Sequence, residues 1–315
     1  MRERNPPDRV PQPSRFRIVA AALAIGLSSF GLAGCLSVGE TPIASATSGS
    51  PGPQGPKGPD GAALWLIPSP IPGLNMRATL VVPQGAGPFP LAVIAHGSEQ
   101  DANRRALQPM PAFPALTDWF LKHNYAVLIP ERPGHGKTGG RYLEDQGPCD
   151  SADFVGAGNG AADSIAAAIT SMAGQAQIRR DGVVVAGNSA GGWGALALAA
   201  RNPPSVRAII DFSGGRGGRD RDRAGQNCSP ERLVAAAGTF GKTARIPTLW
   251  LYAANDTYFP PDLSGRMAAA FRDAGGRVDY RLLPAIAGEG HGLIMTPGAA
   301  APWVAPVEAF LRGIR

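Results

Sequence analysis

Residues 183–194, with the sequence VVVAGNSAGGWG, decide the fold expected for this chain. The three valines are β-branched and predict a short strand, and the small residues that follow predict a helix. Between them lies Gly187-Asn188-Ser189-Ala190-Gly191, a G-x-S-x-G pattern with its serine at the apex of a sharp turn. A side chain at either glycine would crowd the neighbouring strand or helix. The pattern is weak alone in a chain with 42 glycines, but its strand–turn–helix context predicts a nucleophile elbow rather than an ordinary glycine-rich turn.

The chain also contains the partners that a nucleophilic serine needs. A serine hydroxyl requires a base, and the base requires a carboxylate that fixes its tautomer. Only one of the four histidines, His291, follows Ser189, and it lies in the glycine-rich stretch 288–292. Asp256 stands between them, just after the apolar run 248–252. The sequence therefore predicts Ser189 as nucleophile, His291 as base and Asp256 as the orienting acid, in the order serine, aspartate, histidine.

Asp211 is the alternative acid. It also ends a predicted strand, in Ile209-Ile210-Asp211-Phe212, and some hydrolases place the acid after the strand that follows the nucleophile strand. The position of Asp256 is the commoner one, so Asp256 is favoured.

These motifs, together with LAVIAHGS at 91–98, resemble the α/β-hydrolases, on the branch of dienelactone-hydrolase-like and prolyl-oligopeptidase-like enzymes. The resemblance covers residues 63–315. It implies that backbone N–H groups of Ala190 and Ser98 bind the oxyanion of a tetrahedral intermediate. Dienelactone hydrolases carry a cysteine nucleophile where this chain has Ser189, which leaves the substrate open.

Alternating strand and helix signals from residue 63 onward predict an α/β fold, a mostly parallel eight-stranded sheet with helices on both faces. Strands are expected at residues 64–67, 77–82, 91–95, 125–130, 182–186, 206–212, 248–252 and 278–283. Helices are expected at residues 113–123, 160–172, 189–200, 263–274 and 304–314.

The other three histidines are expected to have lesser roles. His96 lies in the loop motif before Ser98 and is interpreted as structural. His135 follows a predicted strand in a Gly-rich turn, where it is the alternative for substrate contact. His123 ends a predicted helix and is expected to be a surface or capping residue.

Cysteines and arginines mark two further features. Cys149 and Cys228 are expected to form a disulfide in an exported protein, with two separate thiols as the alternative and a metal site as the weakest interpretation.

Residues 214–225 are rich in glycine, arginine and aspartate and form a possible cap. Four arginines there favour an anionic substrate, but interleaved aspartates favour a self-paired, solvated loop equally.

The first 62 residues are expected to lie outside the catalytic domain. Arg15 and Arg17 precede a short apolar run, which is typical of a signal peptide. Leu32-Ala33-Gly34-Cys35 resembles the bacterial lipobox, so residues 1–34 are expected to be removed and Cys35 to be lipidated. Glycine at every third position within 49–61, with proline, is collagen-like, but five glycines are too few to hold three chains together. A single-chain polyproline II spacer is therefore favoured, and residues 35–62 are expected to form a tether.

Composition excludes one class of partner. The net charge of +6 falls to +3 without residues 1–34, which hold five arginines and two acidic residues. No basic run with interleaved aromatic residues remains, so nucleic-acid binding is not expected.

The sequence thus predicts an exported, lipid-anchored serine hydrolase that cleaves an ester or related acyl bond of a small molecule. No metal or organic cofactor is expected, and the oligomeric state is open. A prolyl-oligopeptidase-type peptidase is the alternative, and a non-catalytic binding protein on a hydrolase scaffold is a second one.

Overall fold

The computed structural model describes residues 51–55, 61–297 and 301–314. They belong to one of two structural units of the chain, residues 42–315. The predicted signal peptide, Cys35 and most of the predicted tether lie outside the described residues. Within the described part, no helix is long and apolar enough to cross a membrane.

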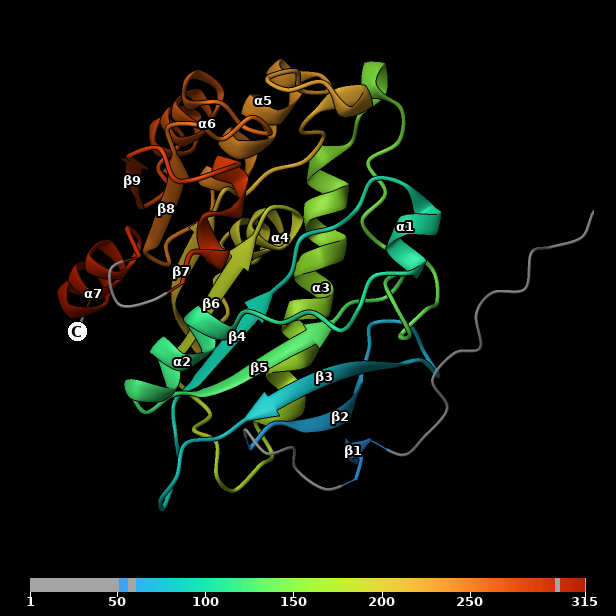
Figure 1. The fold of residues 1–315 in the computed structure, drawn as a ribbon, viewed down its shortest axis with the longest axis vertical. Coiled ribbons are helices and arrows are strands. Elements are labelled where there is room, and N and C mark those ends of the chain that lie inside the picture. The colour runs from blue at the N-terminus through green and yellow to red at the C-terminus, as the bar shows by residue number, and fades with distance from the viewer. Residues whose placement is uncertain (1–50, 56–60, 298–300, 315) are drawn as a thin grey trace, which may run out of the picture. The chain divides into compact units, whose positions relative to one another are not determined.

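The core of the protein is a nine-stranded sheet in the order β1-β2-β3-β5-β4-β6-β7-β8-β9 (Figure 1). Strands β1, β2, β3 and β5 pair antiparallel, and all pairs from β5 to β9 are parallel. Their bounds are β1 Gly52–Pro53, β2 Ala63–Pro68, β3 Asn75–Val81, β4 Leu91–Ala95, β5 Ala126–Glu131, β6 Val183–Asn188, β7 Val206–Phe212, β8 Thr248–Ala253 and β9 Val278–Leu283.

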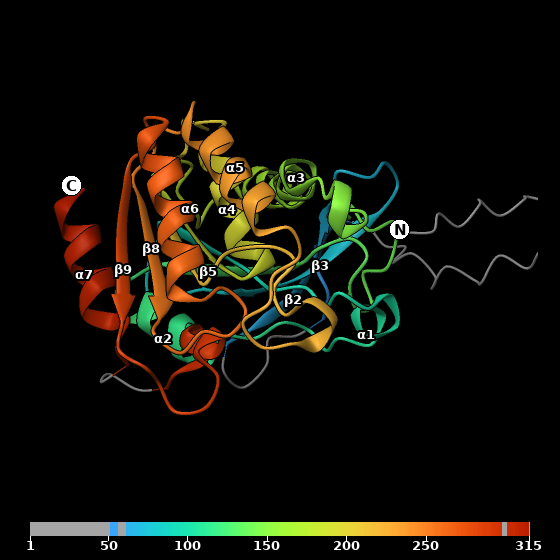
Figure 2. The same cartoon turned by 90° about the horizontal axis from the view of Figure 1, so that it is seen from above.

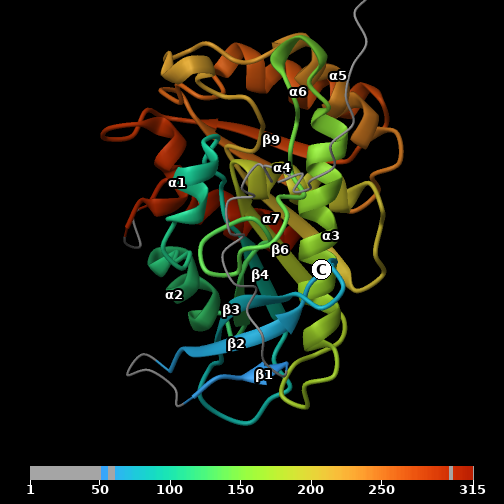
Figure 3. The ribbon, with the colours of Figure 1, turned by 90° about the vertical axis from the view of Figure 1, so that its right-hand side faces the viewer.

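The predicted fold is confirmed, but the predicted number of eight strands is wrong. The ninth strand, β1, is a two-residue pairing at the outer edge of β2 (Figure 3). It comes from the Gly/Pro-rich stretch, where no apolar alternation signals a strand. Backbone pairing with an edge strand needs no particular side chain, so its sequence carries no signature.

Helices cover both faces of the sheet because its parallel strands are apolar on both sides. In β4, Leu91, Val93 and Ala95 join the apolar cluster under α3, α4, α5 and α6, and the alternating residues Ala92 and Ile94 join the cluster under α2 and α7. Figure 2 shows α6 and α7 on opposite sides of β8 and β9. The bounds are α1 Ala102–Ala106, α2 Pro114–Lys122, α3 Phe154–Met172, α4 Ala190–Ala199, α5 Pro230–Gly241, α6 Pro261–Asp273 and α7 Val304–Gly313.

The sequence analysis missed α1 and α5 and began α3 too late. The apolar period of α5 was present, since Leu233, Ala236, Ala237 and Phe240 are all buried on one face. Helix α3 begins six residues before the expected start, where Asp153 caps it by accepting from Gly156 N at 2.7 Å. Its first turns contain three glycines, which argue against a helix by propensity, and tertiary packing overrides them.

Candidate active site

The carboxyl ends of the parallel strands open onto a cavity of about 900 Å³. Parallel strands end at one edge of the sheet, so the loops after β4, β5, β6, β7 and β8 meet there. Ser98, Ser189, Ala190 and His291 all line the cavity. Asp256 lies behind it, with its side chain fully buried.

Ser189 stands in a strained turn between β6 and α4, with φ 54° and ψ −120°. This conformation is unfavourable for any residue with a side chain. A Cβ atom at Gly187 would meet the backbone of Gly191, and one at Gly191 would meet the carbonyl oxygens of Ala95 and His96. Glycine at both positions therefore lets helix α4 start directly against β4, with the serine at the apex.

The structure brings Asp256 and His291 together. Asp256 Oδ2 lies 3.2 Å from His291 Nδ1, and Asp256 Oδ1 accepts from the backbone N–H groups of Tyr258 and Phe259 at 2.8 and 3.0 Å. The His291 ring stacks on Tyr258 with centroids 4.1 Å apart. These contacts hold the imidazole with Nδ1 toward the acid, which leaves Nε2 for a second partner.

Ser189 and His291 share the cavity, but the described residues contain no hydrogen bond between the serine hydroxyl and the histidine ring. Such bonds are often long in a protein without substrate. The residue types and their edge of the sheet agree with acyl transfer by a serine.

Asp211, the alternative acid, is not paired with a histidine. It is fully buried, with Oδ2 3.2 Å from the Tyr252 hydroxyl, which donates to Gly214 O at 2.6 Å. Asp211 Oδ1 has no hydrogen-bond partner among the described residues. Burial raises the pKa of Asp211 well above its ordinary value, and the nearby Asp256 raises it further, against the bonds from Tyr252 and Gly214. Burial therefore favours the neutral form of the Asp211 carboxyl.

Because of that raised pKa, we expect Asp211→Asn to change how stability depends on pH. The folded protein keeps the proton, whereas the unfolded chain loses it near about pH 4, so stability falls as the pH rises from there toward the folded pKa. Asparagine is neutral and lacks this loss. The variant should gain stability relative to wild type between pH 5 and pH 8 in urea denaturation. Exposed Asp118→Asn is the control, and equal pH slopes in all three proteins would contradict the prediction.

Glu289 is a site residue that the sequence analysis missed. Its carboxylate accepts from Thr257 N at 2.9 Å, from Thr257 Oγ1 at 2.5 Å and from His291 N at 3.1 Å. Partial burial raises the pKa of Glu289, but the bonds from Thr257 and His291 outweigh it and leave the pKa lowered. The carboxylate thus joins the loop of Asp256 to the loop of His291. The sequence signal that could have identified Glu289 is its place two residues before the candidate base His291.

Replacing Glu289 with glutamine should weaken this connection, because an amide has one acceptor oxygen in place of two. We expect kcat on an ester substrate to fall about tenfold with KM little changed, because the substitution disturbs the position of His291 relative to Asp256 and removes no substrate contact. Glu308→Gln, on α7, is the control. A loss that appears only in KM would indicate a substrate contact.

The loop 96–98, here named the β4 loop, runs directly over the nucleophile. A Cβ atom on Gly97 would lie 3.3 Å from Ser189 Cβ. Ser98 therefore lies beside the elbow. Ala190, the residue after the nucleophile, is the first residue of α4. The oxyanion role of the two backbone amides stays a prediction.

The remaining histidines are structural in their contacts. His123 caps the end of α2 and stacks on Trp119 at 3.9 Å. His96 and His135 are both buried, with ring centroids 4.7 Å apart. His135, the alternative for substrate contact, directs Nε2 to Ser98 Oγ at 2.9 Å.

The predicted disulfide between Cys149 and Cys228 is present. It joins residues 132–153, here named the β5 loop, to residues 213–229, here named the β7 loop. The arginines of the β7 loop are largely paired within the protein: Arg223 with Asp220, Arg219 with Asp222 and Glu289, and Arg216 with Glu144. The pairs with Asp220 and Asp222 lie within the loop, as the self-paired interpretation expects, whereas the pairs with Glu144 and Glu289 join the loop to its neighbours. The loop nevertheless lines the cavity at residues 215–219, 221 and 222.

In the part of the chain that the structure describes, no three His, Cys, Asp or Glu side chains gather so as to hold a metal ion. The cavity instead presents hydroxyl, imidazole, guanidinium and backbone groups.

Residues 76–223 match a family model described as Esterase PHB depolymerase. The match covers just under half of the chain and includes Ser98, Ser189 and Ala190, but ends before Asp256 and His291. No functionally curated protein sequence matches the chain significantly.

Solved structures with the same fold include esterases and peptidases. A puromycin-hydrolyzing peptidase from Mycobacterium tuberculosis is 19% identical, with a TM-score of 0.55 over 81% of this chain and 40% of its own. Dipeptidyl peptidase 4 from Porphyromonas gingivalis is 14% identical, with a TM-score of 0.57 over 80% of this chain and 35% of its own. An esterase from Pyrococcus furiosus is 12% identical, with a TM-score of 0.53 over 80% of this chain and 92% of its own.

The chain thus spans about two fifths of the length of the peptidases that it matches, and most of the length of the Pyrococcus esterase. At these identities the similarity to the solved structures concerns the fold. The chain therefore has the α/β-hydrolase fold, and its central part is similar to the Esterase PHB depolymerase family of serine hydrolases.

Proposed function

We propose that this protein is an exported serine hydrolase that cleaves an ester or related acyl bond of a small molecule. Ser189 Oγ attacks the carbonyl carbon while His291 Nε2 takes its proton, and Asp256 stabilises the resulting imidazolium. The backbone N–H groups of Ala190 and Ser98 bind the oxyanion. His291 then protonates the leaving group, and water releases the acyl group by the same steps.

One observation carries this proposal: the 3.2 Å contact between Asp256 and His291 lies at the cavity that contains Ser189 in its strained turn. A base oriented by a buried carboxylate beside a strained serine is the arrangement that acyl transfer requires. No step of the proposed reaction requires a metal or an organic cofactor.

Two measurements on the full chain in detergent test the proposal. A fluorophosphonate probe should label the wild type and not Ser189→Ala, and a p-nitrophenyl ester series should show turnover that depends on Ser189. Labelling without ester turnover would favour a peptide or an unusual acyl group. Absence of both would leave the non-catalytic binding protein.

We also propose that the protein is anchored to a membrane through lipid on Cys35. The motif Leu32-Ala33-Gly34-Cys35 supports this, together with the apolar segment before it. Several acyl chains anchor a protein firmly, whereas one binds only marginally.

Cys35→Ser should therefore move the protein from the detergent phase to the aqueous phase in Triton X-114 partitioning. A wild type already found in the aqueous phase, or equal partitioning of the two proteins, would contradict the anchor. Cys149→Ser in the catalytic domain is the matched control and should leave partitioning unchanged.

A further inference from the structure

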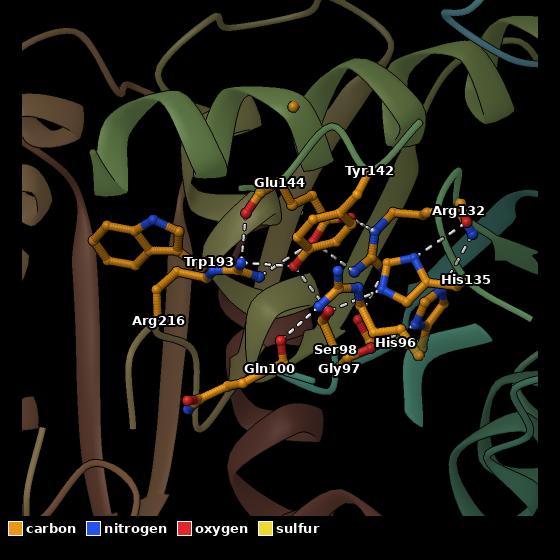
Figure 4. Close-up of polar contacts among 12 residues, drawn as sticks. His96, Gly97, Ser98, Gln100, Arg132, His135, Tyr142, Glu144, Trp193 and Arg216 are labelled. Carbon is orange, nitrogen blue, oxygen red and sulfur yellow. Dashed lines mark hydrogen bonds and ion pairs between the residues drawn. The ribbon is translucent and has the colours of Figure 1, made fainter. Parts of the chain in front are cut away.

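A largely buried polar network joins the β4 loop to two neighbouring loops, and the proposed reaction uses none of its side chains (Figure 4). Its members come from three loops that are far apart in the sequence. They are His96 and Ser98 of the β4 loop, Arg132, His135, Tyr142 and Glu144 of the β5 loop, and Arg216 of the β7 loop.

The centre of the network is the ion pair between Arg132 and Glu144, both buried. Arg132 Nε and Nη2 donate to the two carboxylate oxygens at 2.6 and 3.1 Å. Its Nη1 donates to the carbonyl oxygen of His96 at 2.7 Å. His96 Nε2 accepts from Arg132 N at 3.1 Å, and its Nδ1 faces the carbonyl of Gly97 at 2.6 Å. The backbone of the β4 loop is thus held at two successive carbonyl groups.

A second part of the network holds the side chain of Ser98. Arg216 Nη2 donates to Tyr142 Oη at 2.7 Å, Tyr142 Oη lies 2.9 Å from Ser98 Oγ, and Ser98 Oγ lies 2.9 Å from His135 Nε2. His135 Nδ1 faces the carbonyls of Arg132 and Pro133 at 3.2 Å each, so it carries the proton and Nε2 accepts.

Arg216 and His135 are the two ends of this chain of hydrogen bonds, and they determine which atom donates in each bond between them. A guanidinium only donates, so the Tyr142 oxygen accepts from Arg216 and its hydroxyl is free to donate to Ser98. Ser98 in turn donates to His135. Ser98 Oγ also lies 3.3 Å from the carbonyl oxygen of Glu99, which is a longer contact than the two at 2.9 Å to Tyr142 and His135. The shorter contacts thus give the serine hydroxyl one donor, Tyr142, and one acceptor, His135.

This arrangement requires a neutral His135. Burial lowers the pKa of His135 to about 4, with Glu144 opposing and Arg132 adding to the shift. Burial likewise lowers the pKa of His96 well below its ordinary value. Both rings are thus neutral acceptors at neutral pH, consistent with the hydrogen bonds.

The disulfide stabilises the same assembly. Cys228 N donates to Gly217 O at 2.7 Å, directly beside Arg216, and Cys149 lies in the loop that carries Tyr142 and Glu144. The Arg105 guanidinium covers the outer face of the Tyr142 ring at 3.8 Å. Tyr142 is thereby held between two arginines from different segments.

We propose that the side chain of Ser98 is a positioning residue, whose hydrogen bonds to Tyr142 and His135 place the Ser98 backbone amide for the oxyanion. This inference rests on the proposed function. An oxyanion donor stabilises the transition state only at the correct place, and losing one costs 10²- to 10³-fold in kcat. The hydrogen bonds of the Ser98 hydroxyl fix the position of the residue whose amide must be placed. Losing the hydroxyl is therefore expected to displace the amide and lower kcat.

The test compares Ser98→Ala, Tyr142→Phe and the double variant in ester hydrolysis by the full chain. We expect kcat to fall about ten- to hundredfold in each single variant with KM within about twofold, because the affected amide acts in the transition state. The double variant should be no worse than the more damaged single one, because both remove the same constraint. Ser98→Thr, which keeps a hydroxyl, should restore most of kcat.

The chain offers a matched control. Ser264 Oγ and Tyr280 Oη form a similar pair at 3.0 Å between α6 and β9. Ser264→Ala and Tyr280→Phe remove the same atoms away from the β4 loop and should leave kcat unchanged. If Ser98→Ala does not fold, as judged by its thermal transition, Tyr142→Phe decides the question alone.

Three outcomes would overturn the inference. Ser98→Ala and Tyr142→Phe with wild-type kcat would do so while leaving the proposed function intact. Turnover that survives in Ser189→Ala and disappears in Ser98→Ala would make Ser98 and His135 the nucleophile and base. A wild type without Ser189-dependent turnover would remove the proposed function and this inference together.

Discussion

Ser189→Ala should lower kcat for ester hydrolysis by about 10⁶-fold, the loss seen when a hydrolase of this mechanism loses its nucleophile. The remaining groups at the cavity cannot replace the serine oxygen, because the acyl–enzyme no longer forms. KM should change little, since the hydroxyl contributes little to ground-state binding. Steady-state kinetics with an active-site titration measures both values.

Two further variants separate the nucleophile from its strained backbone. Ser189→Gly should be equally inactive but more stable to urea by about 1 kcal/mol, because φ 54° and ψ −120° suit glycine and disfavour other residues. Ser213→Ala is the control, since Ser213 also has a positive φ, 51°, but is fully buried. It should keep its activity. Substantial turnover by Ser189→Ala would mean that another residue is the nucleophile.

Asp256→Asn should lower kcat by about 10⁴-fold, because the amide stabilises the wrong tautomer of the base and cannot balance the imidazolium charge. Asp256 accepts two backbone N–H groups through Oδ1 and faces His291 through Oδ2. An asparagine can keep the first oxygen in place and present its NH₂ group to the ring. The fold should therefore survive while the base is lost.

Asp211→Asn provides the comparison that distinguishes the two candidate acids. Asp211 contacts Tyr252 rather than a histidine, and its neutral carboxyl resembles an amide. We expect kcat of Asp211→Asn to stay within about threefold of wild type at pH 7.5, since the substitution removes no catalytic charge. A 10⁴-fold loss in Asp211→Asn together with an active Asp256→Asn would reverse the assignment.

The parts of the protein that local sequence determines are those with short-range signatures. Eight of the nine strands were predicted, and the five central ones, β4 to β8, have the clearest signature, because buried parallel strands are largely apolar runs between turn residues. The elbow was predictable because Gly187 and Gly191 stand at fixed spacing around Ser189. The cysteine pairing followed from their number and expected compartment rather than from their spacing.

The contacts that only the tertiary structure decided join residues far apart in the chain. Ser98 is 44 residues from Tyr142, and Tyr142 is 74 residues from Arg216. Glu289 reaches Thr257 across 32 residues. None of these residues has a periodicity or a flanking motif that names its partner. A buried polar side chain must find a hydrogen-bond partner wherever the fold brings one near, and only the packing of the loops on the sheet determines which one that is.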